Sequence, residues 1–466
     1  MISDKLKINI HSQLRGLYDN TTDNFRYSLV LIAVLSFGIS SARMLLSAER
    51  PPISIDAAFF QHAGWYITQG AVPYVDIWDI NTPLAFEATA FLAFLSGGNM
   101  YLLHLLSMAV SVSTGVAIVY LTGTLTYEVT NDKLASLTAG LTLLTLAGFH
   151  YLASTGFRPK YPSIAFGLAA LLLQFRDRPG YSGCAAAISA GFVQHSAVFA
   201  ILALGLAIQR GGRKRLTNTI LGMLLTTIVV VAPLVIVGAG EAMLVQTVLV
   251  PLSGSGSTGL LSIVRRLGKG MILTGFASIP IVLGVYGLFR IGTRDIRKNW
   301  WILSGGTIYG IQVFLVDFNS YPDLFFGLVF VAMGLGLLVN TLDEPKRRII
   351  PGVLAIIVLI SVVSLGGFGY VTNETVYTKS LDDSLAESDT ILHNVVLSAE
   401  EYFNARDARG GQMNPDLPFD RPDLEALYWE KQKPPSCHYR LSAKEIQWIE
   451  RTGGAYEKEN CGQYSW

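Results

Sequence analysis

The chain has 466 residues, of which 51% are hydrophobic and only 15% are charged, with a formal net charge of +1. Soluble domains carry about 25% charged residues, so the composition disfavours a soluble protein, and the small net charge gives no electrostatic reason to expect a nucleic-acid partner. The apolar residues occur in blocks of about 15 to 25 residues, the length that crosses a bilayer. We therefore expect an all-α polytopic membrane protein.

The polar segment 1–20 lacks the pattern of a cleavable signal peptide and precedes a full-length span. Single spans are predicted at 27–46, 101–125, 134–151, 161–175, 216–237, 271–289, 300–316, 324–339 and 349–370. The apolar block 183–208 is too long for one span and has Gln194 and His195 at its middle. We expect a hairpin of two short helices there, and about eleven transmembrane helices in total. A single tilted helix is the alternative, and it would reverse every later segment.

The distribution of basic residues favours the hairpin. It places all the dense basic clusters on one side of the membrane, namely 5–26, 176–178, 210–215, 290–298 and 346–348. Cytoplasmic loops carry an excess of Lys and Arg, whereas a single helix would split these clusters between the two sides. We therefore expect a multi-pass cell-membrane protein whose N-terminus is cytoplasmic and whose C-terminal segment is extracytoplasmic.

The first outer loop, 47–98, holds the densest set of reactive side chains. Ser54 is a suitable N-cap and Gly70 a suitable stop for an amphipathic helix, which places Asp56 in the first turn, where the helix dipole favours a carboxylate. The apolar segment 83–95 is too short to span and is expected to lie at the membrane interface. The polar residues singled out in this loop are Asp56, His62, Asp76 and Asp79.

Cations on the outer side depart from the charge rule. Arg158 and Lys160 lie in a short outer loop, and Arg265, Arg266 and Lys269 end a longer one. An anionic partner such as a lipid phosphate is the simplest reason for them, and interfacial anchoring is the alternative. The last short outer loop carries Asp317, Tyr321 and Asp323.

The domain organisation follows from this topology: residues 1–370 form a transmembrane domain and 371–466 a small extracytoplasmic C-terminal domain. Helical patterns are expected at 381–400 and 442–451, and Asn373 begins an N-glycosylation acceptor pattern. Cys437 and Cys461 could pair on an oxidising side, and two free thiols are the alternative.

The first outer loop resembles that of the GT-C glycosyltransferases. The resemblance rests on Asp56 after the first span, Gly70-x-x-Pro73-Tyr74-x-Asp76, Trp78-Asp79 and Pro83-Leu84. Within this superfamily the chain is most similar to the archaeal dolichyl-phosphate-mannose mannosyltransferases. The resemblance implies a multi-span enzyme that takes a sugar from a polyprenyl-phosphate donor and adds it to a glycan outside the cell during N-glycan assembly.

The resemblance also implies roles for individual residues. The family's loop acid, as catalytic base or acceptor-positioning residue, corresponds to Asp56, although the second acid that many members carry beside it is absent, since Ile55 and Ala57 flank it. Many related loops have a Lys two residues after the Asp that corresponds to Asp79, where this chain has Asn81. Its absence leaves the donor phosphate to other cations, for which the candidates are Arg158, Lys160, Arg265 and Arg266.

An inverting transfer needs a single carboxylate, because a phosphate leaving group needs little protonation. We expect Asp56 to be that general base, and a plain helix-capping role is the alternative. Asp76 and Asp79 either orient the acceptor or form Asx-type turns. Asp323 is placed on the acceptor side by its location at the outer end of a span.

No cofactor is required by the sequence. A divalent-cation site built from His62 and the acids is kept as an alternative, because divalent ions help some members of this superfamily. His195 is interpreted as a turn residue in preference to a donor ligand. The stretch 254–259 matches a dinucleotide fingerprint by letter, but no strand precedes it, so we expect a loop.

A secondary transporter or lipid-linked-substrate flippase is the alternative class. Transporters usually carry ionisable groups near the midplane and have repeated halves. Here the acids gather in one interfacial loop and the halves do not resemble each other. The sequence therefore favours the glycosyltransferase.

Overall fold

The computed structural model describes residues 21–47, 51–77, 79–249, 251, 260–316 and 321–363, together with 429, 431, 455–457 and 463–465. Several predicted features lie outside these described residues: the helices 381–400 and 442–451, the loop 254–259, Trp78, Asp317, Asn373, Cys437 and Cys461.

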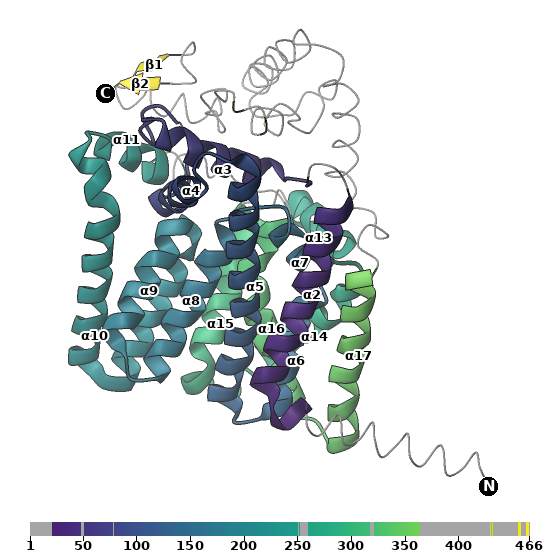
Figure 1. Cartoon of the computed structure of the whole chain (residues 1–466). Coiled ribbons are helices and arrows are strands. Elements are labelled where there is room, and N and C mark those ends of the chain that lie inside the picture. The colour runs from purple at the N-terminus through teal and green to yellow at the C-terminus, as the bar shows by residue number, and fades with distance from the viewer. Residues whose placement is uncertain are drawn as a thin grey trace.

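The described chain is a bundle of helices whose axes are roughly aligned and extend between two ends of the molecule (Figure 1). The first half of the bundle contains α2 (Phe25–Ser47), α5 (Met100–Thr130), α6 (Lys133–Leu144), α7 (Ala147–Ala153), α8 (Lys160–Phe175) and α9 (Pro179–Phe192). The second half contains α10 (Ala197–Ile236), α14 (Ser278–Arg290), α15 (Ile296–Ile311), α16 (Phe325–Val339) and α17 (Glu344–Val363).

Four described helices are long and apolar enough to cross a membrane, and α6 with α7 adds a fifth as a broken span bent by 66°. The predicted span 134–151 is therefore not one straight helix. The predicted span 271–289 is also broken, because its first residues belong to α13 (Leu260–Thr274) and the chain turns through η3 (Gly275–Ala277), where Gly275 has φ +51°. A helical membrane protein with several apolar helices agrees with the predicted class.

The predicted hairpin within 183–208 is confirmed, and the single-helix alternative is wrong. The turn η1 (Gln194–Ser196) separates α9 from α10. The residues that precede and follow the hairpin lie close together. Arg215 Nη1 lies 2.7 Å from Asp177 Oδ1, and the Arg210 guanidinium lies 4.6 Å from the centre of the Phe175 ring. The helix α10 is itself interrupted by non-helical backbone at Gly211 and Gly212, so its second half returns as the next predicted span.

The two helices predicted for the segment 54–95 are confirmed. The Ser54 hydroxyl accepts a hydrogen bond from Ala57 N at the start of α3 (Ile55–Thr68), and Gly70 follows its C-cap with φ +101°. The helix α4 (Pro83–Leu95) has the predicted bounds and begins with the fixed φ of a proline. Both helices lie across one end of the bundle (Figure 1).

Short irregular elements connect the rest. They are α11 (Gly240–Leu244), the π-helices η2 (Val245–Leu249) and η4 (Gln312–Val316), and the 3₁₀ turn η5 (Tyr321–Leu324). In the C-terminal segment, β1 (Ala455–Glu457) pairs antiparallel with β2 (Gln463–Ser465), so the described chain is not purely helical. The Trp429 ring packs 5.9 Å from that of His104 on α5.

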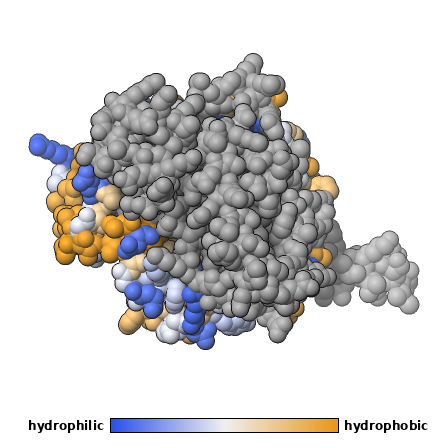
Figure 2. Space-filling view, turned by 90° about the horizontal axis from the view of Figure 1, so that it is seen from above, coloured by the Kyte–Doolittle hydropathy of each residue, from blue (hydrophilic) through white to orange (hydrophobic). Residues whose placement is uncertain are grey.

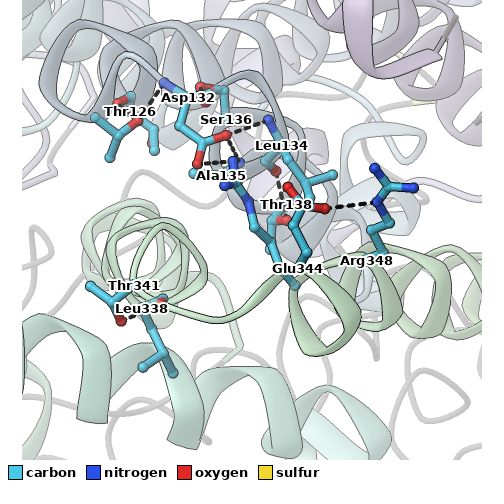
Figure 3. A network of polar contacts seen from close by, with 12 residues as sticks. Thr126, Asp132, Leu134, Ala135, Ser136, Thr138, Leu338, Thr341, Glu344 and Arg348 are labelled. Atoms are coloured by element: carbon cyan, nitrogen blue, oxygen red, sulfur yellow. Dashed lines mark hydrogen bonds and ion pairs between the residues drawn. The ribbon is translucent and has the colours of Figure 1, made fainter. Parts of the chain in front are cut away.

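Charged residues gather near the starts of α6 and α17 (Figure 3), at the end of the bundle opposite α3 and α4 (Figure 1). Lys133 Nζ lies 2.9 Å from Asp23 Oδ1, Arg348 Nε lies 2.9 Å from Glu344 Oε2, and Arg347 pairs with Asp132. These residues line a cavity of about 650 Å³. We call these three pairs the lower network.

The sides of the bundle are apolar. Large hydrophobic residues such as Leu31 on α2, Val229 on α10 and Leu359 on α17 are exposed. Hydrophobic residues also gather at the edge of the described surface in the view from above (Figure 2). Such a belt fits lipid contact, since apolar patches of this extent are rare on soluble monomers.

Candidate active site

The centre of the candidate site is an ion pair between Asp56 and Arg158. Arg158 Nη1 lies 3.1 Å from Asp56 Oδ2, although 102 positions separate the two residues in the sequence. The Arg158 side chain is only 5% exposed, whereas that of Asp56 is 49% exposed. The cation is thus buried, while the carboxylate remains half exposed at the end of the bundle that carries α3 and α4, which we call the outer end.

A second pair, between Lys160 and Asp323, joins the start of α8 to η5. The Lys160 side chain is 27% exposed and that of Asp323 is 19% exposed. His195 lies close enough for both charges to act on it, and Tyr309 Oη donates a hydrogen bond to the His195 carbonyl oxygen at 3.2 Å. Three segments that were singled out separately in the sequence therefore meet here.

Asp76 and Asp79 organise the loop between α3 and α4. Asp76 Oδ2 accepts a hydrogen bond of 2.7 Å from Val72 N, and Asp79 Oδ1 accepts one of 2.7 Å from Asn81 N. Asp76 is exposed, whereas Asp79 is buried. The Asp79 contact, to the backbone two residues further on, has the form of an Asx-type turn, whereas the Asp76 contact ties the loop to a residue four positions earlier.

Tyr74 and Gln246 hold the same loop from below. Tyr74 has φ +69°, and its hydroxyl donates to Asn81 O at 2.7 Å. Gln246, on the π-helix η2, donates to Tyr74 O at 2.8 Å and accepts from Asp79 N at 3.1 Å. Burial, with Asp79 and Glu87 nearby, raises the pKa of the Tyr74 hydroxyl well above its usual value, so this hydroxyl stays protonated as a donor.

The remaining predicted site residues are less central. Arg266 Nη1 donates to Phe314 O in η4 at 3.1 Å, and the side chains of Arg265 and Lys269 lie outside the described part. His62 is buried, with its ring 5.1 Å from that of Trp65. Among the described residues, no group of three or more His, Cys, Asp or Glu could hold a metal ion.

Sequence reasoning missed three buried polar residues that shape the site, namely Gln61, Ser111 and Gln246. Each lies in a predominantly apolar helix and bonds to a loop backbone. Buried polar side chains usually have hydrogen-bond partners, so polar residues inside apolar blocks are the signal that could have identified them.

Comparisons with known proteins identify the family of this chain. The family model described as DolP-mannose mannosyltransferase matches residues 70–232, which include Arg158, Lys160 and His195. The chain is 31% identical over 441 residues to the dolichol phosphate-mannose mannosyltransferase of the archaeon Haloferax volcanii, covering 93% of this chain and 96% of that relative. These matches confirm the predicted family. The chain belongs to the DolP-mannose mannosyltransferase family.

Proposed function

We propose that this protein is a membrane mannosyltransferase that moves mannose from a dolichyl- or polyprenyl-phosphate donor to a glycan acceptor, lipid-linked or protein-linked, at the outer membrane face. The donor follows from the name of the Haloferax volcanii relative and from the family description. The observation that carries the proposal is an accessible Asp56 carboxylate held by the buried Arg158 guanidinium, with Lys160 two residues further along.

Asp56 acts as the general base. Its carboxylate takes the proton of the acceptor hydroxyl while that oxygen attacks C1 of the sugar, and the C1–O bond to the lipid phosphate breaks with its electron pair on the phosphate. Attack opposite the leaving group inverts a β-linked donor to an α-linked product. Positive charge beside the leaving phosphate stabilises the charge that develops there.

Lys160 is the main ligand of the donor phosphate in this proposal. It is more exposed than Arg158, and a phosphate is a strong acceptor for a Lys ammonium. The phosphate exchanges for Asp323 on Lys160, which leaves Asp323 on the acceptor side together with the loop acids Asp76 and Asp79. Arg158 adds charge from behind Asp56, and Arg265 and Arg266 add charge from α13.

The proposed topology has about eleven spans, a cytoplasmic N-terminus, and a transmembrane domain of 1–370 followed by an extracytoplasmic domain of 371–466. The basic clusters at the lower end support it. Arg43 near the end of α2 donates to Val362 O and Val363 O at 3.1 and 2.8 Å, so α17 ends at the same side as the site. Exposed Phe91 and Phe94 support an interfacial position for α4.

The transporter alternative is less well supported. The Asp56–Arg158, Lys160–Asp323 and Asp132–Arg347 ion pairs lie at the two ends of the helices, whereas transporters usually carry ionisable groups near the midplane. The proposed reaction needs no cofactor, and dependence on a divalent cation would appear as loss of transfer on chelation.

The test is transfer of labelled mannose from dolichyl-phosphate mannose in membranes that contain equal amounts of wild type and Asp56→Asn. We expect the variant to lose about 10²- to 10⁴-fold in rate, the usual contribution of a general base, and to retain donor binding. Glu128→Gln is the control, because Glu128 pairs with Arg176 at the lower end. An Asp56→Asn enzyme with the wild-type rate would exclude Asp56 as the base, and inert wild type would contradict the proposed activity.

A further inference from the structure

The segment between α7 and α8 is held by hydrogen bonds from two other helices. Thr155 O accepts from Ser54 N at 3.2 Å, at the start of α3. Gly156 O accepts from Ser111 Oγ on α5 at 2.8 Å, and Phe157 N donates to Gln61 Oε1 on α3 at 3.0 Å. Arg158 N then donates to the same Ser111 hydroxyl at 3.1 Å. Four consecutive residues are thus fixed through their backbones, immediately where the Arg158 side chain begins.

The approach of this segment to α3 is unusually close. Gly156 has φ +116°, and a Cβ added there would lie 2.4 Å from Gln61 Oε1 and 2.7 Å from Ala57 Cβ. A non-glycine residue would face both a disfavoured backbone conformation and a collision. We call the hydrogen bonds of Gln61 and Ser111 to residues 156–158 the clamp. The clamp depends on Gly156 as well as on these two polar side chains.

The two side chains that make the clamp are fixed themselves. Gln61 and Ser111 are fully buried, where an unsatisfied polar atom would cost about 1–3 kcal/mol. Gln61 Nε2 also lies 3.3 Å from His104 Nδ1, so the amide is held at both of its ends. Such a side chain has little freedom to release Phe157.

We infer that Gln61 and Ser111 are positioning residues that hold the Arg158 guanidinium on the Asp56 carboxylate. The helix α3 then supplies both the base and one anchor of the cation that orients it. Displacing a catalytic group by about 1 Å can cost about 10²-fold in rate. The buried hydrogen bonds of the clamp fix the backbone that carries Arg158, and Arg158 in turn fixes the position of the Asp56 carboxylate. The inference rests on the proposed function for its catalytic consequence, whereas its geometric part does not.

Accessibility of Arg158 tests the geometry without any assay of transfer. Phenylglyoxal modification of Arg158 would be followed by peptide mass spectrometry in the purified protein. We expect slow modification in wild type and about 3-fold or faster modification in Gln61→Met and Ser111→Ala, because each variant removes an anchor of the segment. Ser107→Ala is the matched control: Ser107 lies one turn earlier on α5, is buried, and has no hydrogen-bond partner among the described residues. Unchanged modification in both clamp variants would overturn the inference.

A double-mutant cycle tests the catalytic consequence. Gln61→Met should lower transfer about 10- to 100-fold in wild type and by less than about 2-fold in an Arg158→Gln background, since residues that act through one another are not additive. A merely structural role predicts the same loss in both backgrounds, which would also overturn the inference. Inert wild type would contradict the proposed function alone, because the modification rates would still report the clamp.

Discussion

Ion pairs occur at both ends of this molecule, but they are built differently. At the outer end, Arg158 is buried while its partner Asp56 is half exposed. In the Arg347–Asp132 pair of the lower network, by contrast, the acid is the more buried partner, since Asp132 is 7% exposed and Arg347 is 24% exposed. Both partners are exposed in the other two pairs of that network. The Asp56 carboxylate is therefore accessible to a bound molecule. The Asp132 carboxylate instead accepts hydrogen bonds from the backbone of its own helix.

Left-handed backbone occurs at both ends, at Tyr74 and Gly156 on one side and at Asn131 and Asp177 on the other. The two ends differ in their helices. The outer end has two π-helices, η2 and η4, whereas at the lower end Asp132 is a regular N-cap that accepts from Leu134 N and Ala135 N. Irregular and strained backbone tends to gather at functional sites. The π-helices and the accessible Asp56 carboxylate support our proposal that the chemistry occurs at the outer end.

The largest further effect is expected at Lys160. Lys160→Met should raise KM for the phosphate donor about 10- to 100-fold, because a hydrogen bond to a charged group contributes about 1.5–3 kcal/mol, with a smaller change in kcat. Donor titrations of the transfer rate measure this. Lys133→Met removes a lysine from the lower network and should leave KM unchanged. An equal rise of KM in both variants would remove the distinction between the two ends.

Asp132→Ala should act on stability and leave the chemistry intact. The variant removes the N-cap of α6 and the partner of Arg347, and loss of such a cap costs about 0.5–2 kcal/mol. Thermal unfolding in detergent would show a lower midpoint, while the transfer rate per folded molecule stays at the wild-type value. A large loss of rate per folded molecule would instead place the lower network in the catalytic machinery.

A pH effect on stability is expected from Glu87 on α4. Burial raises the pKa of this carboxyl from 4.5 to about 7, so folding favours its protonated form. This contribution is fully present below pH 4.5 and is lost as the pH rises to about 7. Glu87→Gln should lack that decline and should be more stable than wild type above pH 7. Parallel unfolding curves for the two proteins across this range would contradict the expectation.

The smallest effect is expected at Glu344. It forms an exposed pair with Arg348 four residues later on α17, and such pairs contribute about 0.3–0.5 kcal/mol. Glu344→Gln should shift the unfolding midpoint only slightly and should not change transfer. A loss as large as that of Asp132→Ala would show that the lower network acts as one unit.

Local signals in the sequence predicted the helices of the first outer loop well. Ser54, Gly70 and Pro83 are cap and start residues whose effect depends on their immediate neighbours. The hairpin around His195 was predictable because charge distribution adds information beyond apolar length. The breaks between α6 and α7 and at Gly275 were not predictable, since a continuous apolar run gives no sign of where tertiary packing bends it.

The site was predictable as a set of residues but not as an arrangement. Asp56, Arg158, Lys160 and Asp323 were each singled out, yet their pairing depends on contacts across more than a hundred positions. From the sequence we expected a lipid phosphate as the anionic partner of Arg158. In the structure, the Asp56 carboxylate pairs with Arg158. The clamp residues Gln61 and Ser111 were missed because their role lies in backbone contacts that only the folded chain brings together.

The most direct test compares the loss of one carboxylate at each end of the molecule. Single-turnover transfer of labelled mannose would be measured per folded molecule for wild type, Asp56→Asn and Asp132→Asn. We expect a loss of about 10²- to 10⁴-fold for Asp56→Asn and a rate within about 2-fold of wild type for Asp132→Asn, since neutralising a lower-end acid acts on stability. Similar losses in both variants, or full activity in Asp56→Asn, would contradict the assignment of the chemistry to the outer end.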